Sequence, residues 1–130
     1  MAGPLVRNPA GNVEDSARRF PTAASLLKNA LSEKLQPDYS VDRGTQEVDW
    51  VAGMFMLFRA GDFRSVGGFD EAYFLYYEDV DLCRRLRSAG SRVSYAPSAE
   101  VVHDARRASR RNPRLALHHL KGALRFLASG

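Results

Sequence analysis

The amino-acid sequence predicts a mixed α/β fold, and three features of its hydrophobic pattern carry that prediction. Apolar residues recur at helical spacing in residues 22–35 and again in residues 79–89. Between these segments, residues 51–58 are apolar at almost every position, as expected of a strand that is covered on both faces. A chain of 130 residues, 45% of them hydrophobic, can form one domain with a core, so wholesale disorder is excluded.

The first half of the chain is expected to alternate between loops and short elements. Residues 1–20 are polar and predict a loop, with a short strand at residues 12–18. A helix over residues 22–35 follows. A polar connection then leads to a strand over residues 48–59, and residues 60–66 provide one or two helical turns.

The second half is expected to hold a helix, two short strands and a final helix. The helix of residues 79–89 ends before Gly90, at a position where a left-handed backbone commonly closes a helix. Residues 91–95 alternate like a strand, and residues 101–103 form another short strand after the break at Pro97. The last helix begins at the second Asn-Pro pair of the sequence, since proline suits the first helical position.

Charge, cysteine content and apolar runs limit the functions open to the chain. The net charge of +4, carried by 16 arginines and 3 lysines, permits an anionic partner without naming one. The single cysteine, Cys83, excludes an internal disulfide and fits a reducing compartment, so a cytoplasmic location is expected. The longest apolar run, residues 51–58, is too short to span a membrane.

Three carboxylates stand at the start of the helix of residues 79–89. On a helix that advances 100° per residue, Asp79 shares the apolar stripe, whereas Asp81 falls on the solvent side, four residues before Arg85. The apolar stripe consists of Leu82, Cys83, Leu86 and Ala89. Asp79 is therefore expected to point into the interior or a cleft. It is either a helix-capping acid bonded to backbone N–H groups or a proton-transfer group with a pKa raised by desolvation.

Three stretches of the sequence have a distinctive composition and spacing: VDWVAGMFMLFR, GGFDEAYFLYYEDVDLCRRLRSAG and VSYAPSAEVVH. Together, over residues 48–103, they resemble the carboxy-terminal half of family 2 glycosyltransferases, in particular the rhamnosyltransferase-like inverting enzymes of bacterial cell-envelope polysaccharides. A weaker likeness, GNVEDSARRFP, covers residues 11–21. The resemblance implies a partial GT-A fold, the nucleotide-diphospho-sugar transferase fold, whose carboxy-terminal half has a mixed sheet with flanking helices.

The resemblance also implies how the chain is divided and what it lacks. Residues 1–47 are expected to be a connecting segment with one helix, residues 48–103 the half-domain, and residues 104–130 a basic segment with an amphipathic helix. The nucleotide-binding half with its Asp-x-Asp metal motif is absent, and Asp79-Val80-Asp81 lies in the wrong element to replace it. We therefore expect a fragment that is inactive alone.

The implied reaction is the inverting transfer of a sugar, rhamnose in the nearest group, from a nucleotide-diphosphate donor to a glycan or lipid-linked acceptor. Such a reaction needs a carboxylate on the acceptor side, which takes the hydroxyl proton as the sugar carbon is attacked. The resemblance assigns this catalytic role to the pair Glu78 and Asp79, with Asp79 as the base.

Four further residues are candidates for acceptor binding. The resemblance places the turn Gly67-Gly68 beside the acceptor, and two glycines allow a close backbone approach. Asp70 is expected either to contact acceptor hydroxyls or to cap the next turn. Trp50, the only tryptophan, either stacks on a sugar or nucleotide ring or belongs to the core.

A divalent metal, Mn²⁺ or Mg²⁺, is implied for the complete enzyme. His103 resembles the third ligand that some enzymes of this kind add to the Asp-x-Asp carboxylates. The other interpretation is a histidine that is hydrogen-bonded at a strand end. With the other ligands missing, we expect no tightly bound metal in this chain.

A basic segment and an amphipathic helix end the chain. The arginines of the basic segment are Arg106, Arg107, Arg110, Arg111 and Arg114. The apolar stripe of the helix is Ala116, Leu120, Ala123, Leu124 and Leu127, and His118 and His119 are interpreted as surface residues. The basic residues form either a solvated face or a docking site for an anionic membrane that carries a lipid-diphosphate acceptor. Nucleic acid is disfavoured because no nucleic-acid-binding motif accompanies the charge.

Two other functions compete with transferase activity. One is a non-catalytic module that binds glycan or a separate amino-terminal half, and the other is a basic polyanion-binding domain. We also expect self-association, most simply as a homodimer, because the strand of residues 51–58 would lack its neighbours from the missing half.

Overall fold

The two longest strands of the structure come from opposite parts of the chain. The computed structural model describes residues 1–31, 37–104 and 112–129. Strand β1 (Ala2–Arg7) runs parallel to β6 (Ser94–Val102), and the register between them shifts after Pro4. Because Leu5 and Val6 of β1 are buried, this pair forms the centre of the sheet.

Short strands flank the central pair. β2 (Val13–Glu14) pairs antiparallel with β1, and β4 (Gln46–Glu47) pairs antiparallel with β6, which gives the order β2-β1-β6-β4. A separate antiparallel pair joins β3 (Ala17–Arg18) to β5 (Trp50–Val51). The sheet is therefore mixed, and with the helices it confirms the predicted α/β class.

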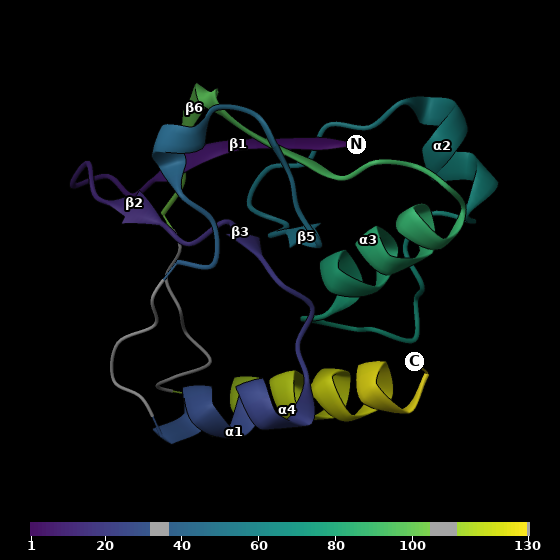
Figure 1. Ribbon diagram of the computed structural model, residues 1–130. Coiled ribbons are helices and arrows are strands. Elements are labelled where there is room, and N and C mark those ends of the chain that lie inside the picture. The colour runs from purple at the N-terminus through teal and green to yellow at the C-terminus, as the bar shows by residue number, and fades with distance from the viewer. Residues whose placement is uncertain (32–36, 105–111, 130) are drawn as a thin grey trace.

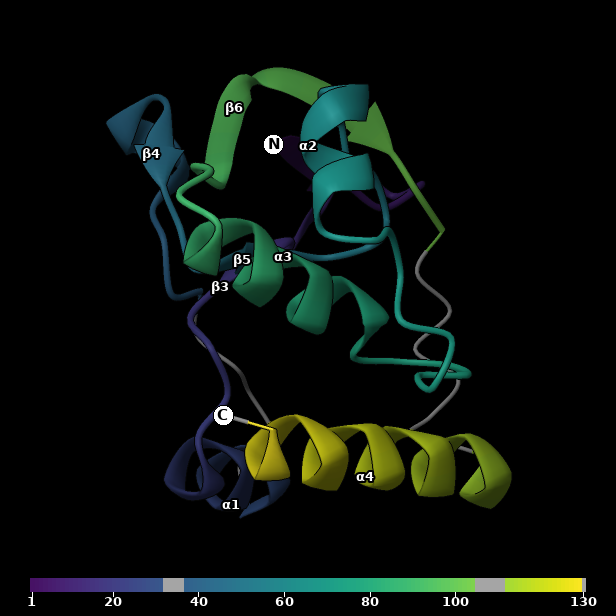
Figure 2. The same cartoon turned by 90° about the vertical axis from the view of Figure 1, so that its right-hand side faces the viewer.

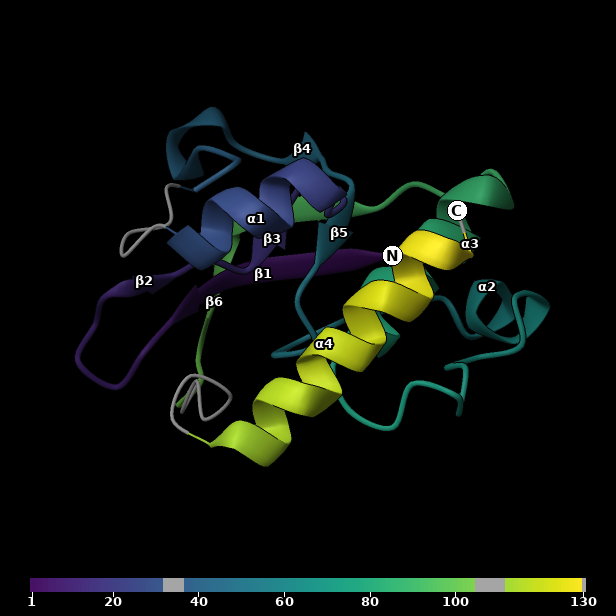
Figure 3. The ribbon, with the colours of Figure 1, turned by 90° about the horizontal axis from the view of Figure 1, so that it is seen from below.

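The described residues form four α-helices and one 3₁₀ turn. These are α1 (Ala23–Leu31), the 3₁₀ turn η1 (Val41–Arg43), α2 (Ala60–Ser65), α3 (Glu78–Ser88) and α4 (Pro113–Ala128). In two perpendicular views α3 lies between the long strands and the pair α1 and α4 (Figure 1 and Figure 2). Seen from below, α1 and α4 lie in front of the strands (Figure 3). This central place makes α3 the helix with the largest set of buried residues, namely Val80, Asp81, Leu82, Cys83 and Leu86.

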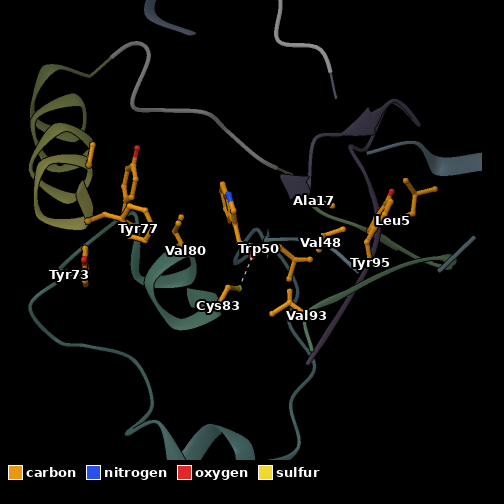
Figure 4. Close-up of a cluster of buried hydrophobic side chains, with 13 residues drawn as sticks. Leu5, Ala17, Val48, Trp50, Tyr73, Tyr77, Val80, Cys83, Val93 and Tyr95 are labelled. Atoms are coloured by element: carbon orange, nitrogen blue, oxygen red, sulfur yellow. Dashed lines mark hydrogen bonds between the residues drawn. The ribbon is translucent and has the colours of Figure 1, made fainter. Parts of the chain in front are cut away.

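The core extends from the sheet through α3 to α4. Figure 4 shows Leu5 and Tyr95 at the sheet end of the cluster and Tyr73 and Tyr77 beside α4. Cys83 of α3 is fully buried in the middle, where burial raises the pKa of its thiol to about 12. Cys83 is therefore a packing residue, and α3 is fixed between two layers.

Most predicted helices are confirmed. α1 and α2 form within the predicted segments, and α3 ends before Gly90, whose φ of 83° gives the left-handed closure. α4 begins at Pro113, and the Asn112 side chain accepts a hydrogen bond from the N–H of Arg114. The short strand expected in residues 12–18 is present as the two pieces β2 and β3.

The strand predicted over residues 48–59 is wrong for most of its length. β5 stops at Val51, and the backbone N–H of Gly53 donates to a side chain of α3 instead of to a strand. Two large apolar side chains that follow, Phe55 and Leu57, are exposed. Self-association stays a prediction, although the strand on which it was based is only two residues long.

Two strands were misjudged for a common reason. β1 lies where a polar loop was expected, and β6 is one strand where two were predicted. The register shift after Pro4 lets the β1–β6 pairing continue past Pro97, which is itself buried. Proline therefore marks an irregularity inside a strand here rather than its end.

In α4, only Ala123 of the predicted apolar stripe is buried in the core. Gly122, Ala123 and Phe126 are the buried residues of the helix, whereas three leucines of the predicted stripe are exposed. Of the basic segment, residues 106, 107, 110 and 111 lie outside the described residues. Within the described ranges, no helix is both long enough and apolar enough to cross a membrane.

Candidate catalytic and acceptor site

The loop before α3 brings its first carboxylates to the edge of the core. Tyr76 and Tyr77 have left-handed backbones, with φ of 68° and 71°, and Tyr77 is the residue that precedes the helix. A non-glycine residue in this conformation costs on the order of 1–3 kcal/mol. Because two occur in succession, surrounding packing must hold this turn, and Glu78 and Asp79 follow it directly.

Asp79 is half-buried and, among the described residues, is hydrogen-bonded only to backbone groups. The N–H of Gly53 donates to its Oδ2 at 2.7 Å, and the N–H of Val80 donates to its Oδ1 at 2.8 Å. Burial raises the pKa of Asp79, and these N–H groups oppose that rise only in part. In the described part of the chain, no lysine or arginine forms an ion pair with it.

These contacts combine the two sequence-based interpretations of Asp79. Its bonds to backbone N–H groups resemble those of a capping acid, and its desolvation is that of a proton-transfer group. A carboxylate has about four lone-pair positions, so two N–H donors leave capacity for a hydroxyl donor. Asp79 can thus be held in place and still accept a proton.

Glu78 precedes Asp79 and differs from it in its hydrogen bonds. It is half-buried, and its Oε2 is a buried oxygen that finds no hydrogen-bond partner within the described ranges. Burial raises the pKa of Glu78, and the nearby Asp79 carboxylate adds to the effect. The two predicted catalytic acids are therefore adjacent and both desolvated.

Asp81 does not face solvent as predicted. Only 4% of the residue is exposed, and its carboxylate pairs with Arg84 at 3.1 Å and with Arg85 at 2.7 Å. Arg85 also donates to the carbonyl of Val66, and Arg84 donates to the carbonyl of Phe126 in α4. The helical-wheel prediction was wrong because elements pack on both sides of α3, which buries a wider arc than one stripe. Ala89, predicted to be in the stripe, is exposed.

Helix α4 holds the loop that precedes Asp79. The His119 ring lies 5.4 Å from the Tyr76 ring and 5.2 Å from the Tyr77 ring, and Phe126 lies 6.0 Å from Tyr77. A Cβ at Gly122 would come within 2.9 Å of the Tyr76 carbonyl oxygen, so only glycine allows this approach. His119 is exposed, as the sequence predicted, but nothing in the pattern of α4 indicates its contact with the two tyrosine rings.

The glycine turn and Asp70 form the other end of the same loop. Gly67 and Gly68 close α2 with φ of 78° and 71°. Asp70 accepts a hydrogen bond from the N–H of Ala72 at 2.9 Å, which lowers its pKa, and Arg125 of α4 approaches it at 3.5 Å. The turn-capping interpretation of Asp70 is therefore observed, and the residue lies at the foot of the loop that leads to Asp79.

Two predicted site residues have other surroundings. Trp50 is only 8% exposed, donates from its ring N–H to the carbonyl of Arg19 at 2.8 Å, and belongs to the core, which favours its structural interpretation. His103 is exposed just beyond β6, and its backbone N–H donates to the carbonyl of Arg7. Among the residues described, no three His, Cys, Asp or Glu side chains come together as a metal site.

Comparison with known proteins gives matches along almost the whole chain. The family described as "Glycosyltransferase like family 2" matches residues 8–118. The chain is 40% identical to the N-acetylglucosaminyl-diphospho-decaprenol L-rhamnosyltransferase of Mycobacterium tuberculosis, over 97% of this chain and 44% of that protein. It is also 40% identical to the rhamnosyltransferase WbbL of Escherichia coli strain K12, over 95% of this chain and 48% of the relative.

A shorter match agrees with these two. The pre-mycofactocin glycosyltransferase of Mycobacterium tuberculosis is 43% identical over 52% of this chain and 16% of its own length. No solved structure matches the chain. The chain spans less than half the length of the two rhamnosyltransferases, and its mixed sheet with flanking helices is consistent with part of a GT-A fold. The protein belongs to glycosyltransferase family 2.

Proposed function

We propose that this chain forms the acceptor-side, base-bearing part of an inverting glycosyltransferase. The observation that carries the proposal is Asp79, a desolvated carboxylate at the start of a fixed helix that forms no ion pair with any described residue. Asp81, two residues later, differs in being neutralised by two arginines. A raised pKa strengthens Asp79 as a proton acceptor, which is the property that the reaction needs.

In the proposed mechanism, Asp79 accepts the proton of an acceptor hydroxyl while the hydroxyl oxygen attacks the anomeric carbon of the donor sugar. The new carbon–oxygen bond forms on the face opposite the nucleotide diphosphate. The bond to the diphosphate breaks, and its electron pair leaves with the nucleotide, so the configuration at carbon inverts. Protonated Asp79 then returns its proton to solvent. The bonds from Gly53 and Val80 hold the carboxylate in position throughout.

The sugar and the acceptor are proposed from the relatives. Both long matches are rhamnosyltransferases, so we propose rhamnose as the transferred sugar. The name of the mycobacterial relative specifies a lipid-linked diphosphate acceptor, and we propose the same class here. We propose that the reaction takes place at the cytoplasmic face of the membrane, where such lipid carriers would meet a nucleotide-sugar donor.

Enzymes of this family commonly use a divalent metal, but the residues described here do not form a site for one. His103 is exposed, and no group of three suitable side chains surrounds it in the described ranges. At most, His103 would add one ligand to carboxylates from another part of the enzyme. We propose that donor diphosphate and metal are held outside this chain, so that the chain alone transfers no sugar.

The test is a hybrid enzyme in which this chain replaces the matching segment of the mycobacterial rhamnosyltransferase. A folded hybrid should transfer rhamnose from its nucleotide-diphosphate donor to N-acetylglucosaminyl-diphospho-decaprenol. The isolated 130-residue chain, assayed in parallel, should transfer none. A hybrid that melts cooperatively and binds donor but transfers nothing would contradict the proposal, as would measurable transfer by the chain alone.

A further inference from the structure

A groove separates the loop before α3 from α4. It has a volume of about 220 Å³, and its walls are residues 72–76 of the loop and, from α4, His118, Lys121, Gly122 and Arg125. Figure 1 and Figure 2 both show this loop between α3 and α4. The groove is thus formed by the same loop–helix contact that fixes the turn before Asp79.

The charge of the groove is positive. Lys121 is exposed and takes part in no ion pair within the described ranges, and no carboxylate lines the groove. Arg125 pairs with Asp70 at 3.5 Å, but both side chains are more than a third exposed, at 50% and 39%. Such a pair contributes little to stability, so Arg125 remains available to a stronger anion.

Apolar surface borders these cations on two sides. Phe74 of the loop is 82% exposed although it lies at the groove, where its ring is 5.2 Å from that of His118. On α4 the face next to Lys121 carries exposed leucines at helical spacing. These are Leu117, Leu120, Leu124 and Leu127. A ligand that matches this surface has an anionic head and an apolar chain.

The loop wall of the groove is close in sequence to the proposed base. Tyr76, the last loop residue in its wall, comes three residues before Asp79, and Gly122 in the opposite wall contacts the Tyr76 carbonyl region. A ligand whose anionic head occupies the groove would therefore contact the loop that leads directly into Glu78 and Asp79.

We propose that this groove binds an isoprenoid diphosphate, the lipid-linked end of the acceptor, with Lys121 and Arg125 contacting the phosphates and Phe74 the first isoprene units. The assignment of an acceptor role rests on the proposed function, but the binding itself requires neither donor nor catalysis. The affinity comes from charge-assisted hydrogen bonds to the phosphates and from burial of the exposed Phe74 ring.

The experiment titrates the 130-residue chain with farnesyl diphosphate, a short soluble isoprenoid diphosphate, and measures binding by calorimetry. Farnesol and inorganic pyrophosphate are titrated separately, so that the apolar and anionic contributions are separated. Farnesyl diphosphate should bind at least about tenfold more tightly than either, because each lacks one class of contact. Pyrophosphate binding as tightly as farnesyl diphosphate would overturn the lipid assignment.

Two variants locate the site. Lys121→Gln should weaken farnesyl diphosphate binding about tenfold, as expected for one lost charged hydrogen bond. Phe74→Ala should weaken farnesyl diphosphate but leave pyrophosphate unchanged. The matched controls are Lys28→Gln and Leu27→Ala on α1, which remove the same charge and an exposed apolar side chain away from the groove. Both controls should bind like the parent.

All four substituted side chains are exposed, so the variants should fold like the parent. Thermal unfolding of each variant verifies this. An unchanged affinity in Lys121→Gln, an equal loss in Lys28→Gln, or no binding by the folded parent would overturn the proposal. If the hybrid enzyme transfers sugar but the chain does not bind farnesyl diphosphate, only the assignment of the groove is contradicted. If the chain binds farnesyl diphosphate but the hybrid enzyme is inactive, only the proposed function is contradicted.

Discussion

The first turn of α3 carries two aspartates in opposite settings. Asp81 is almost fully buried and faces two arginines, which tie it to the turn after α2 and to the end of α4. Asp79 is half-buried, accepts hydrogen bonds from backbone N–H groups alone within the described ranges, and has a raised pKa. The residues are of the same type and only two positions apart, yet one has its charge compensated and the other does not.

This difference separates a structural acid from a candidate catalytic acid. A buried ion pair fixes geometry, and loss of one partner leaves an uncompensated charge that destabilises the fold. A carboxylate held by N–H dipoles is oriented but keeps its proton affinity, so its loss should affect chemistry more than stability. The predictions below test this division, beginning with the largest expected effect.

Asp79→Asn should abolish most of the activity of the hybrid enzyme while leaving its fold intact. Removal of a general base typically costs about 10²–10⁴-fold in rate, and we expect kcat to fall within that range. Donor affinity should remain nearly unchanged, because Asp79 is assigned to the acceptor side. The measurements are kcat, donor Kd and the midpoint of thermal unfolding.

The matched control is Asp42→Asn, which removes an exposed carboxylate in η1 and should change none of these values. If Asp79→Asn reduced kcat only in proportion to a loss of folded protein, Asp79 would belong with Asp81 as a structural residue.

Asp81→Asn should reduce the free energy of unfolding of the isolated chain by about 3 kcal/mol. It leaves two arginines, Arg84 and Arg85, without the carboxylate that they share. Small domains have total stabilities of about 5–15 kcal/mol, so the loss is large. Urea unfolding of this variant and of Asp42→Asn measures the difference. A change as small as that of the control would return Asp81 to the solvent side, where the sequence alone had placed it.

The two aspartates also show how far sequence reasoning reaches. The start of α3 and its closing glycine follow from local spacing, and Asp79 was singled out because it interrupts an apolar stripe. The burial of Asp81 was not predictable from that stripe, since it depends on α2 and α4 lying on further sides of the helix. A helical wheel assumes one buried face, and α3 has neighbours on several.

The same limit explains the errors in the fold. Residues 51–58 are as apolar as a covered strand, but most of the segment is irregular, and Phe55 and Leu57 are exposed. β1 went unrecognised because its partner β6 lies about 90 residues away, and that pairing leaves no mark in the local sequence. The helices, which are set by local pattern, were predicted more accurately than the strands, which depend on distant partners.

Gly122→Ala tests whether the turn that precedes Asp79 is held in place by α4. The added Cβ would lie 2.9 Å from the Tyr76 carbonyl oxygen, so helix or loop must shift. Overpacking of this kind costs about 1–3 kcal/mol, and we expect a loss of stability in that range. In the hybrid, kcat should also fall, because Tyr76 and Tyr77 lead directly into the turn that carries the proposed base, Asp79.

The matched control is Gly61→Ala in α2, where an added Cβ meets nothing within 4 Å and alanine has the better helix propensity. It should leave kcat unchanged and stability equal or slightly higher. A similar loss in both variants would mean that the close approach of α4 to the loop does not support the turn.

The smallest expected effect is a pH dependence from His119, whose ring lies against Tyr76 and Tyr77. Partial burial lowers the pKa of His119 below its ordinary value of 6.5, and Arg18 adds to the shift. The unfolded chain therefore binds more protons than the folded chain just below pH 6.5, so this contribution to stability is complete above that pH and is lost on acidification. Asp79 has the opposite sign, because its raised pKa removes stability as pH rises through its folded value.

Urea unfolding at pH 7.5, 6.5 and 5.5 should show a loss of stability towards pH 5.5 that is smaller in His119→Gln. An identical slope in both proteins would show that the contact of α4 with the loop does not sense the charge of His119.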